Sequence, residues 1–145
     1  MSKSNAHENA YLLLLFNNTN FATVGDATGL RGSTAAGQLF MSLHTADPDE
    51  AGTQSTSEVA YTGYARVGVA RSGAAFVVTG NAVALAADVT FPAGTGGSGT
   101  ATHWGIGTAS SGAGVLLYKG TISPSIVTGN GVTPALTAGT VVTED

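Results

Sequence analysis

The sequence predicts a mainly β protein with a single domain and one short helix near the N-terminus. Glycine contributes 21 of the 145 residues, and glycine favours the turns that join strands. Valine and threonine are also frequent, and β-branched residues favour strands. Several short segments alternate apolar with polar residues and are separated by turn residues. Short strands with glycine- and proline-rich turns are typical of an antiparallel sandwich or barrel.

The chain length fits one domain, which we expect to span residues 1–145. A domain of this size buries roughly 70% of the surface that its unfolded chain exposes, so it can hold a core without disulfides or metals. The chain has no cysteine, which excludes disulfides and cysteine-ligated metals. We find no second hydrophobic core in the sequence and no repeat of solenoid length.

Charged residues are scarce and limit the classes of partner. They make up 10% of the chain, against about 25% in ordinary domains, which indicates a surface that is neutral or covered by other proteins. The formal net charge of −4 gives no electrostatic basis for nucleic-acid binding. The longest apolar run, residues 11–16, is far shorter than the roughly 20 residues of a membrane span. The N-terminus also lacks the pattern of a signal peptide, so we expect a soluble, non-secreted protein.

A helix is predicted near residues 6–17. Asn5 followed by Glu8 resembles a capping box with Asn in place of Ser or Thr. Residues 12–16 are continuously apolar, which predicts that this half of the helix is buried on every side. Two alternatives remain open for its role: it closes one end of the fold, or it inserts between subunits.

Two polar segments are predicted to be functional loops. Residues 17–37 are rich in Gly, Asn, Thr and Ser, and the segment is long for a structureless loop in a compact domain. Such a loop is either functional or held by a partner. Residues 45–57 are polar and contain the turn sequence DPDEAG. We name these the 17–37 segment and the 45–57 loop.

Strands are predicted from alternation with a period of two. The first, residues 39–44, is expected to be half-buried. The most regular is 82–91, which Pro92 ends because proline cannot donate to a ladder. Gly80-Asn81 is predicted to form a tight hairpin. Further strands are predicted at 59–70, 75–79, 101–108, 115–122, 125–128 and 137–143.

Two motifs with possible chemistry have a simpler structural explanation. Residues 94–99 match G-x-G-x-x-G, but a strand pattern follows instead of the helix that a dinucleotide site needs, so we interpret them as a sheet-connecting loop. The only cluster with metal-ligand chemistry is His44 with Asp47, Asp49 and Glu50. Its spacing does not match a calcium loop, and acidic turn residues are usually solvated.

No catalytic constellation is visible. The chain has no G-x-S-x-G elbow for a serine nucleophile, and the only acid in a regular strand, Asp88, is predicted to face outward. Trp104 alternates with Thr102 and Ile106 and is interpreted as a core anchor. Tyr61, Tyr64 and Trp104 together could instead form a carbohydrate platform. Tyr64 shares a face with Arg66 and is a candidate interface residue. The sequence therefore assigns no catalytic, cofactor-binding or metal-binding residue.

Five short segments carry a resemblance to a known family. They are residues 42–48 (SLHTADP), 50–54 (EAGTQ), 58–67 (EVAYTGYARV), 91–95 (FPAGT) and 101–108 (ATHWGIGT). Together they resemble a family of small tailed-bacteriophage virion proteins, which are often labelled tail fibre proteins. Some of these resemble the capsid cement, or decoration, proteins of short-tailed phages.

The resemblance implies a fold, a location and partners. It implies a jelly-roll-like β-sandwich without enzymatic activity or cofactor, made in the host bacterial cytoplasm and carried on the capsid exterior. There the protein would bind the major capsid protein and neighbouring copies of itself, as a homodimer or a trimer, and would stabilise the shell. The alternative is a tail or head fibre component that binds a tail hub or a host glycan. The 17–37 segment and the 45–57 loop are the candidate contact surfaces.

Overall fold

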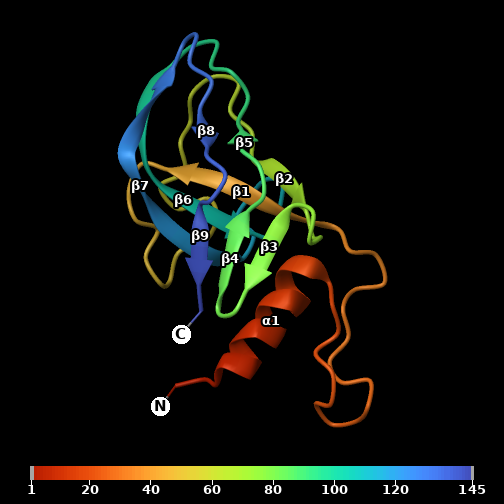
Figure 1. The fold of residues 1–145 in the computed structure, drawn as a ribbon. Helices are drawn as coiled ribbons and strands as arrows, with labels where there is room; N and C mark the ends of the chain where they lie inside the picture. The colour runs from red at the N-terminus through yellow and green to blue at the C-terminus, as the bar shows by residue number, and fades with distance from the viewer. Residues whose placement is uncertain (1, 145) are drawn as a thin grey trace. The chain divides into compact units, whose positions relative to one another are not determined.

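The computed structural model describes residues 2–144 and confirms a mainly β fold with one short N-terminal helix (Figure 1). Within those residues the strands form three antiparallel sheets. The chain divides into two compact units. Of the described residues, the first unit contains 2–38, 70–88 and 137–144, and the second contains 39–69 and 89–136. The single domain and the jelly-roll arrangement stay predictions.

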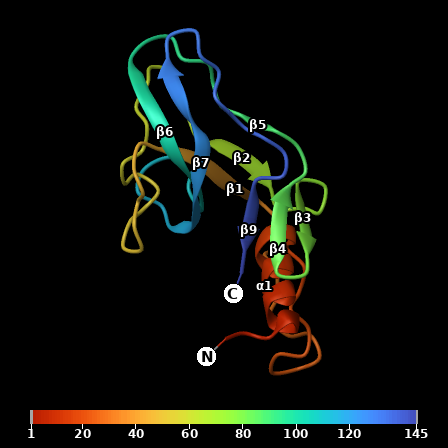
Figure 2. The same ribbon diagram turned by 60° about the vertical axis from the view of Figure 1, so that its left-hand side comes forward.

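The first unit packs a helix against a small sheet (Figure 2). Its elements are α1 (Asn5–Asn17), β3 (Phe76–Thr79), β4 (Ala82–Leu85) and β9 (Val141–Thr143). The sheet order is β3-β4-β9, and β3 and β4 form the predicted two-residue hairpin, with Thr79 opposite Ala82. Phe16 of the helix meets Phe76 of the sheet edge to face, with ring centroids 5.0 Å apart. Aromatic pairs of this geometry stabilise a core beyond the area that they bury.

Helix α1 differs from its prediction in two respects. Its N-cap is Ser4, whose hydroxyl accepts a hydrogen bond from the His7 backbone N–H at 3.4 Å, so the helix begins one residue early. The prediction that the apolar half, residues 12–16, is buried all round was wrong. Leu12 and Phe16 are fully buried, whereas residues 13–15 between them are partly exposed. Residues four apart share one face of a helix, and only that face meets the sheet.

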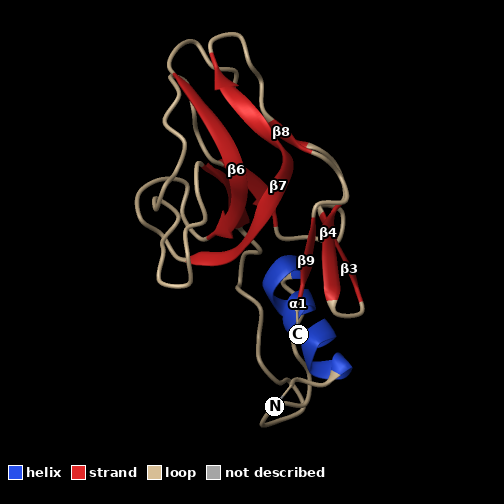
Figure 3. Cartoon of the chain, turned by 90° about the vertical axis from the view of Figure 1, so that its left-hand side faces the viewer, coloured by secondary structure: helices blue, strands red, loops and turns tan. Residues whose placement is uncertain are grey.

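The second unit is built around a four-stranded sheet with the order β2-β1-β6-β7. Its strands are β1 (Gln38–His44), β2 (Val67–Ala70), β6 (Ser98–Gly107) and β7 (Leu116–Gly129), and a separate pair is formed by β5 (Val89–Thr90) and β8 (Ala135–Leu136). The two long strands β6 and β7 run side by side and antiparallel (Figure 3). Leu43 lies opposite Trp104 in the β1–β6 register, and both are buried.

The predicted strand at 82–91 is the clearest error. Two strands occupy it, β4 and β5, and they belong to different sheets. The alternation predicted burial correctly at both ends, but Ala87 is exposed and Asp88 accepts a hydrogen bond from the Ala138 N–H at 2.7 Å. Alanine has a low preference for strands and little side chain to pack, so this stretch serves as the connection between two sheets.

Other strand boundaries also differ from the predictions. The predicted strands at 115–122 and 125–128 are one strand, β7, whose pairing with β6 shifts in register between them. Only Val67–Ala70 of the stretch 59–70 is a strand. Of the stretch 137–143, only Val141–Thr143 is a strand.

Strand β1 is buried on both faces, whereas a half-buried strand was predicted. Met41 and Leu43 face the apolar core, and Ser42 and His44 on the opposite face are also fully buried. A strand with two buried faces needs a second covering layer. Here the 45–57 loop supplies part of it, and the contacts of that loop define the candidate site.

Candidate attachment surface

The 45–57 loop is closed at its base by backbone pairing. The Thr45 N–H donates to the Ser57 carbonyl at 2.7 Å, and the Val59 N–H donates to the Leu43 carbonyl at 3.0 Å. The chain therefore leaves β1 and returns antiparallel to it, so that both ends of the loop are fixed to the sheet.

His44 ties the returning arm of the loop to the buried face of β1. Its Nδ1 lies 2.8 Å from the Thr56 carbonyl oxygen, and its Nε2 lies 2.8 Å from the Ser42 hydroxyl. Because a carbonyl only accepts, these partners place the proton on Nδ1 and make Nε2 the acceptor of the Ser42 hydroxyl. Burial lowers the pKa of the His44 ring, since a buried imidazole is harder to charge.

Gln54 anchors the middle of the loop and is fully buried. Its side-chain oxygen accepts from the Ala109 N–H at 2.9 Å, and its side-chain nitrogen donates to the Phe40 carbonyl at 3.3 Å. Its backbone N–H donates to the Ala113 carbonyl at 2.8 Å. A Cβ on Gly107 would stand only 2.1 Å from the Gln54 side chain, so this position needs glycine for the side chain to approach.

A buried ion pair supports the segment that follows the loop. The Arg66 guanidinium donates to both carboxylate oxygens of Glu58, at 2.7 and 2.8 Å, and to the Ala109 and Gly112 carbonyls. Arg66 is only 8% exposed. The bidentate contact with Glu58 raises the pKa of the Arg66 guanidinium, because an adjacent carboxylate favours the charged form.

Tyr64 joins this ion pair to β1. Its hydroxyl donates to Glu58 at 2.7 Å and accepts from the Leu43 backbone N–H at 3.1 Å. Burial raises the pKa of the Tyr64 phenol. Tyr64, the candidate interface residue, and Arg66 thus both make internal contacts that hold the fold together.

The exposed tip of the loop carries three acids, Asp47, Asp49 and Glu50, which we name the acidic tip. The Lys119 ammonium of β7 donates to Asp47 at 2.7 Å and lies 3.7 Å from Glu50, whose side chain is 98% exposed. The hydrogen bond from Lys119 lowers the pKa of the Asp47 carboxyl. The acidic tip thus holds more negative than positive charge, on a chain that has few charges of either sign.

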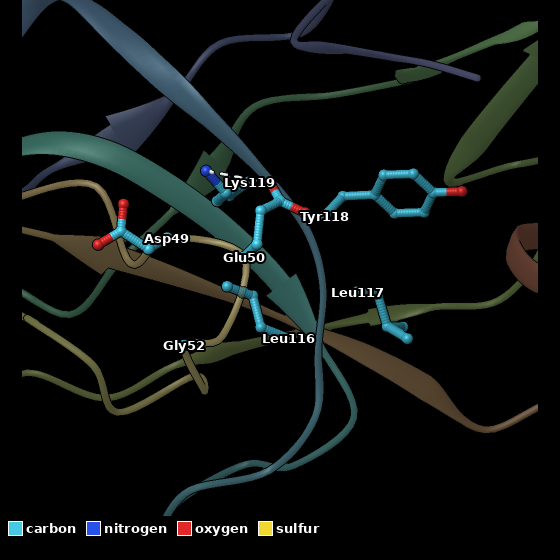
Figure 4. A pocket seen from close by; sticks show the side chains of 7 residues that line it. All are labelled: Asp49, Glu50, Gly52, Leu116, Leu117, Tyr118 and Lys119. Atoms are coloured by element: carbon cyan, nitrogen blue, oxygen red, sulfur yellow. Dashed lines mark ion pairs between the residues drawn. The ribbon is translucent and has the colours of Figure 1, made fainter. Parts of the chain in front are cut away.

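A shallow hollow of about 350 Å³ lies between the acidic tip and the start of β7 (Figure 4). Its β7 side is formed by residues 116–119. Leu116 and Lys119 point toward the loop, whereas Leu117 and Tyr118 point away from it. The β6–β7 register shifts next to these residues, and a bulge of this kind places two consecutive side chains on the same side of a strand.

The structure does not bring the residues of the possible metal cluster together. His44 is fully buried and bound to Ser42 and Thr56, whereas Asp47 and Glu50 are near Lys119. Within residues 2–144 no group of three or more His, Asp or Glu side chains is arranged to hold a metal ion.

The remaining candidate residues also have structural roles. Trp104 is buried, as predicted for a core anchor, and Tyr61 is buried with its hydroxyl donating to the Pro92 carbonyl at 2.8 Å. Neither ring is free to act as a carbohydrate platform. The glycine-rich residues 94–97 lead directly into β6, so the helix that a dinucleotide site requires is replaced by a strand.

The 17–37 segment in the first unit is held by a residue that the sequence did not single out, Arg71. Its guanidinium donates to the carbonyls of Leu14 and Leu15 at 2.7 and 2.6 Å, and to the Ala36 carbonyl at 3.0 Å. A cation at the last turn of a helix complements the free carbonyls and the helix dipole. No short-range pattern predicts this contact, because the partners of Arg71 are far away in sequence.

Hydrogen bonds within the segment shape the rest of residues 17–37. Asn18 ends α1 in the left-handed region, with φ of 56°, and its side chain binds the backbone N–H and carbonyl of Ser33. Asp26 accepts from the Thr28 and Gly29 backbone N–H groups. The hydrogen bond from the Thr28 hydroxyl lowers the pKa of the Asp26 carboxyl. Most side chains of this segment are exposed.

Comparisons with known proteins identify the family. The single helix α1 has 13 residues, and within the described residues no helix has the length and hydropathy of a membrane span. None of the curated proteins compared with this chain matches it. The family model of the podophage GP4 fiber I protein gp80 matches residues 2–144. Because that match covers nearly the whole chain, the protein belongs to the family of the podophage GP4 fiber I protein gp80, a family of tailed-phage virion proteins.

Proposed function

We propose that this protein is a fibre component of a tailed-phage virion and attaches to a neighbouring virion protein through the 45–57 loop. The observation that carries the proposal is the match to a fibre family over residues 2–144. A virion location follows from that family, and membership in a structural family favours a role without catalysis.

The geometry of the loop supports an attachment role. Its base and its middle are anchored by buried hydrogen bonds from His44 and Gln54, while Glu50 at its tip is almost wholly exposed. A surface held in place before binding loses less conformational freedom when it binds. The excess negative charge of the acidic tip suits a partner surface that carries Lys or Arg, because complementary charge speeds association and selects the partner.

The second candidate is a capsid cement protein on the exterior of the major capsid protein shell. The scarcity of charge favours it, together with exposed apolar side chains such as Leu30, Val115 and Val127, which are 49, 59 and 67% exposed. Neighbouring capsid proteins and further copies of this chain, in a dimer or trimer, would cover such a surface. Many copies on one shell would also let weak contacts add through multivalency.

Counting copies in purified virions separates the two candidates. A fibre protein is expected at a copy number near that of the tails, and a cement protein at one near that of the major capsid protein. Electron microscopy of virions decorated with a labelled antibody provides the second measurement: label at the tail or at isolated points supports a fibre, and label over the whole shell supports cement. Uniform shell label at high copy number would overturn the fibre proposal.

The role of the loop is tested by reversing charge at its tip. Glu50→Lys is expected to weaken rebinding of the purified protein to virions that lack it, with unchanged folding, because the side chain is exposed. The matched control is Asp49→Asn, which removes one charge from the same tip without reversing it and is expected to weaken rebinding less. Binding of the purified protein to host cells, with no binding to virions lacking it, would place the contact on a host glycan instead.

A further inference from the structure

One of the contacts that hold the 45–57 loop against β1 is made by a titratable ring. His44 is fully buried, and both of its ring nitrogens are engaged at 2.8 Å, one by the Thr56 carbonyl of the loop and the other by the Ser42 hydroxyl of β1. The neutral ring satisfies both partners, since Nδ1 donates and Nε2 accepts. The other neutral tautomer, with its hydrogen on Nε2, cannot satisfy both partners, because the Thr56 carbonyl has no hydrogen to donate to Nδ1.

Protonation of the ring keeps the Nδ1–H bond to the Thr56 carbonyl, which by itself favours the charged ring, but it disrupts the contact with Ser42. A second proton on Nε2 points at the Ser42 hydroxyl, which must then turn its own hydrogen away from the ring. Ser42 is itself fully buried, so that hydrogen loses its acceptor. The ring also becomes a cation without contact with water, and an unpaired buried charge is among the costliest groups in a protein. Opening of the loop removes both penalties by admitting water.

Other charged groups near the ring do not remove the penalty. Glu58, whose backbone pairs with that of His44, favours the charged ring, while Arg66 and the facing His103 of β6 disfavour it. The carboxylate of Glu58 is already engaged on both oxygens by Arg66, so the attraction it offers is largely compensated. The charged groups on the remaining packed elements are Asp47, Asp49 and Glu50 at the acidic tip and Lys119 of β7.

We propose that His44 is an acid-sensitive latch, which fastens the 45–57 loop to β1 while the ring is neutral and releases the loop when the ring is protonated. Release is local, because two sets of contacts do not titrate. The apolar contacts of Met41 and Leu43 hold the opposite face of β1, and the hydrogen bonds of Gln54 hold the middle of the loop. Regions held by few buried apolar contacts are those that open below the global unfolding free energy.

The direction of the pH dependence follows from linkage. Burial holds the pKa of the closed ring below its ordinary value of 6.5, so protonation favours the open loop. The neutral ring makes its full contribution to the stability of the closed loop above about pH 6.5. This contribution decreases as the pH falls below about 6.5, and it stops decreasing once the ring of the closed loop is also protonated. Because opening is linked to the uptake of one proton, the equilibrium constant for loop opening rises by at most about tenfold for each unit by which the pH falls.

Hydrogen exchange on the full-length protein tests the latch. Protection factors, corrected for intrinsic exchange rates, are compared between about pH 7.5 and about pH 5, a range that a histidine spans. We expect protection to fall for amides of the 45–57 loop while amides of β6 and β7 keep theirs. Unchanged loop protection, or equal loss of protection in loop and sheet, would overturn the proposal.

Two variants and a direct titration sharpen the result. His44→Asn keeps a side-chain N–H near the position of Nδ1 but cannot titrate, so its loop is expected to lose the response to pH. His103→Asn removes the half-exposed histidine on the facing strand and is expected to keep the response.

Nitrogen-15 NMR of the wild-type ring is expected to show the Nδ1–H tautomer at neutral pH and a titration that coincides with loop release. A titration without loop release would refute the latch even if His44→Asn does not fold.

The consequence for attachment rests on the proposed function. If the 45–57 loop binds the neighbouring virion protein, rebinding of wild-type protein to virions that lack it is expected to weaken in acid, and rebinding of His44→Asn is not. A loop that opens in acid without any change in rebinding would leave the latch intact and would refute only the role of the loop in attachment.

Discussion

The 45–57 loop and the 17–37 segment are both long, polar and rich in turn residues, yet the molecule holds them in different ways. The first is anchored by buried groups: a bidentate ion pair beside it, and the side chains of His44 and Gln54. The second is held by Arg71 and by exposed hydrogen bonds within the segment. Hydrogen bonds in a buried, low-dielectric setting are stronger than exposed ones, and their loss costs more.

This difference separates a fixed surface from an adaptable one. At neutral pH we expect the 45–57 loop to hold its acidic tip in one conformation. We expect the 17–37 segment to move more freely, because most of its side chains are exposed. A mobile loop loses conformational entropy when a partner orders it, and this loss weakens binding. If the 45–57 loop binds a neighbouring virion protein as proposed, we expect it to select that partner and the 17–37 segment to adjust to it.

The largest expected effect comes from the buried ion pair. Arg66→Ala leaves the Glu58 carboxylate without its bidentate partner, and loss of one partner of a buried pair destabilises a protein by about 3–5 kcal/mol. Urea unfolding followed by the fluorescence of buried Trp104 measures the loss. The control is Lys119→Ala, which breaks the exposed pair with Asp47 and is expected to cost far less. Equal losses in the two variants would mean that burial is not what distinguishes the two pairs.

Gln54→Ala is expected to rank second. It removes the acceptor of the Ala109 N–H and leaves that donor inside the protein, which costs about 1–3 kcal/mol. The matched control is Ser55→Ala at the next, exposed position, where about 0.5 kcal/mol or less is expected. Thermal and urea unfolding of both variants give the comparison, and a tolerated Gln54→Ala would show that the loop does not depend on this anchor.

Arg71→Ala is expected to loosen the 17–37 segment alone. Loss of charged hydrogen bonds to the helix carbonyls costs about 1.5–3 kcal/mol, and the half-exposed position favours the lower end. Hydrogen exchange is expected to quicken in the 17–37 segment and to stay unchanged in the 45–57 loop. Arg31→Ala, on an exposed residue of the same segment, serves as control; faster exchange in both loops would argue that they are coupled.

The smallest effect is expected at the acidic tip. The hydrogen bond from Lys119 lowers the pKa of Asp47 below its ordinary 3.8, so this contact stabilises the fold above that pH and is lost as the pH falls through the folded value. NMR titration of the Asp47 carboxyl is expected to show its pKa return toward 3.8 in Lys119→Met. An unchanged pKa in that variant would remove Lys119 as the cause.

Sequence patterns predicted elements well where one physical rule operates alone. The alternation at 39–44 and the two residues Gly80-Asn81 predicted β1 and the β3–β4 hairpin correctly. The same rule failed at 82–91, because alternation reports which residues are buried and not which sheet buries them. The second buried face of β1 escaped prediction for a similar reason: Ser42 and His44 are polar, and a polar residue is expected outside unless its hydrogen-bond partners are known.

The candidate site could be predicted only in part. The 45–57 loop and its acids were identified from turn chemistry and composition, and Trp104 from alternation. The inward orientation of Arg66 and Tyr64 was missed, although a charged residue in a chain with so few charges is a signal of internal pairing. Arg71 left no local signal, since its carbonyl partners on α1 are more than 50 positions away.

By itself, the sequence determined the β class, the short helix and the polar loops, because these depend on backbone preference, alternation and turn chemistry within a few residues. It also carried the resemblance to virion proteins that the family match bears out. Only the tertiary structure decided which loop is anchored by buried contacts and which by contacts at the surface. That distinction depends on contacts between residues far apart in the chain, and on whether each hydrogen bond is buried or exposed to water, which no local pattern encodes.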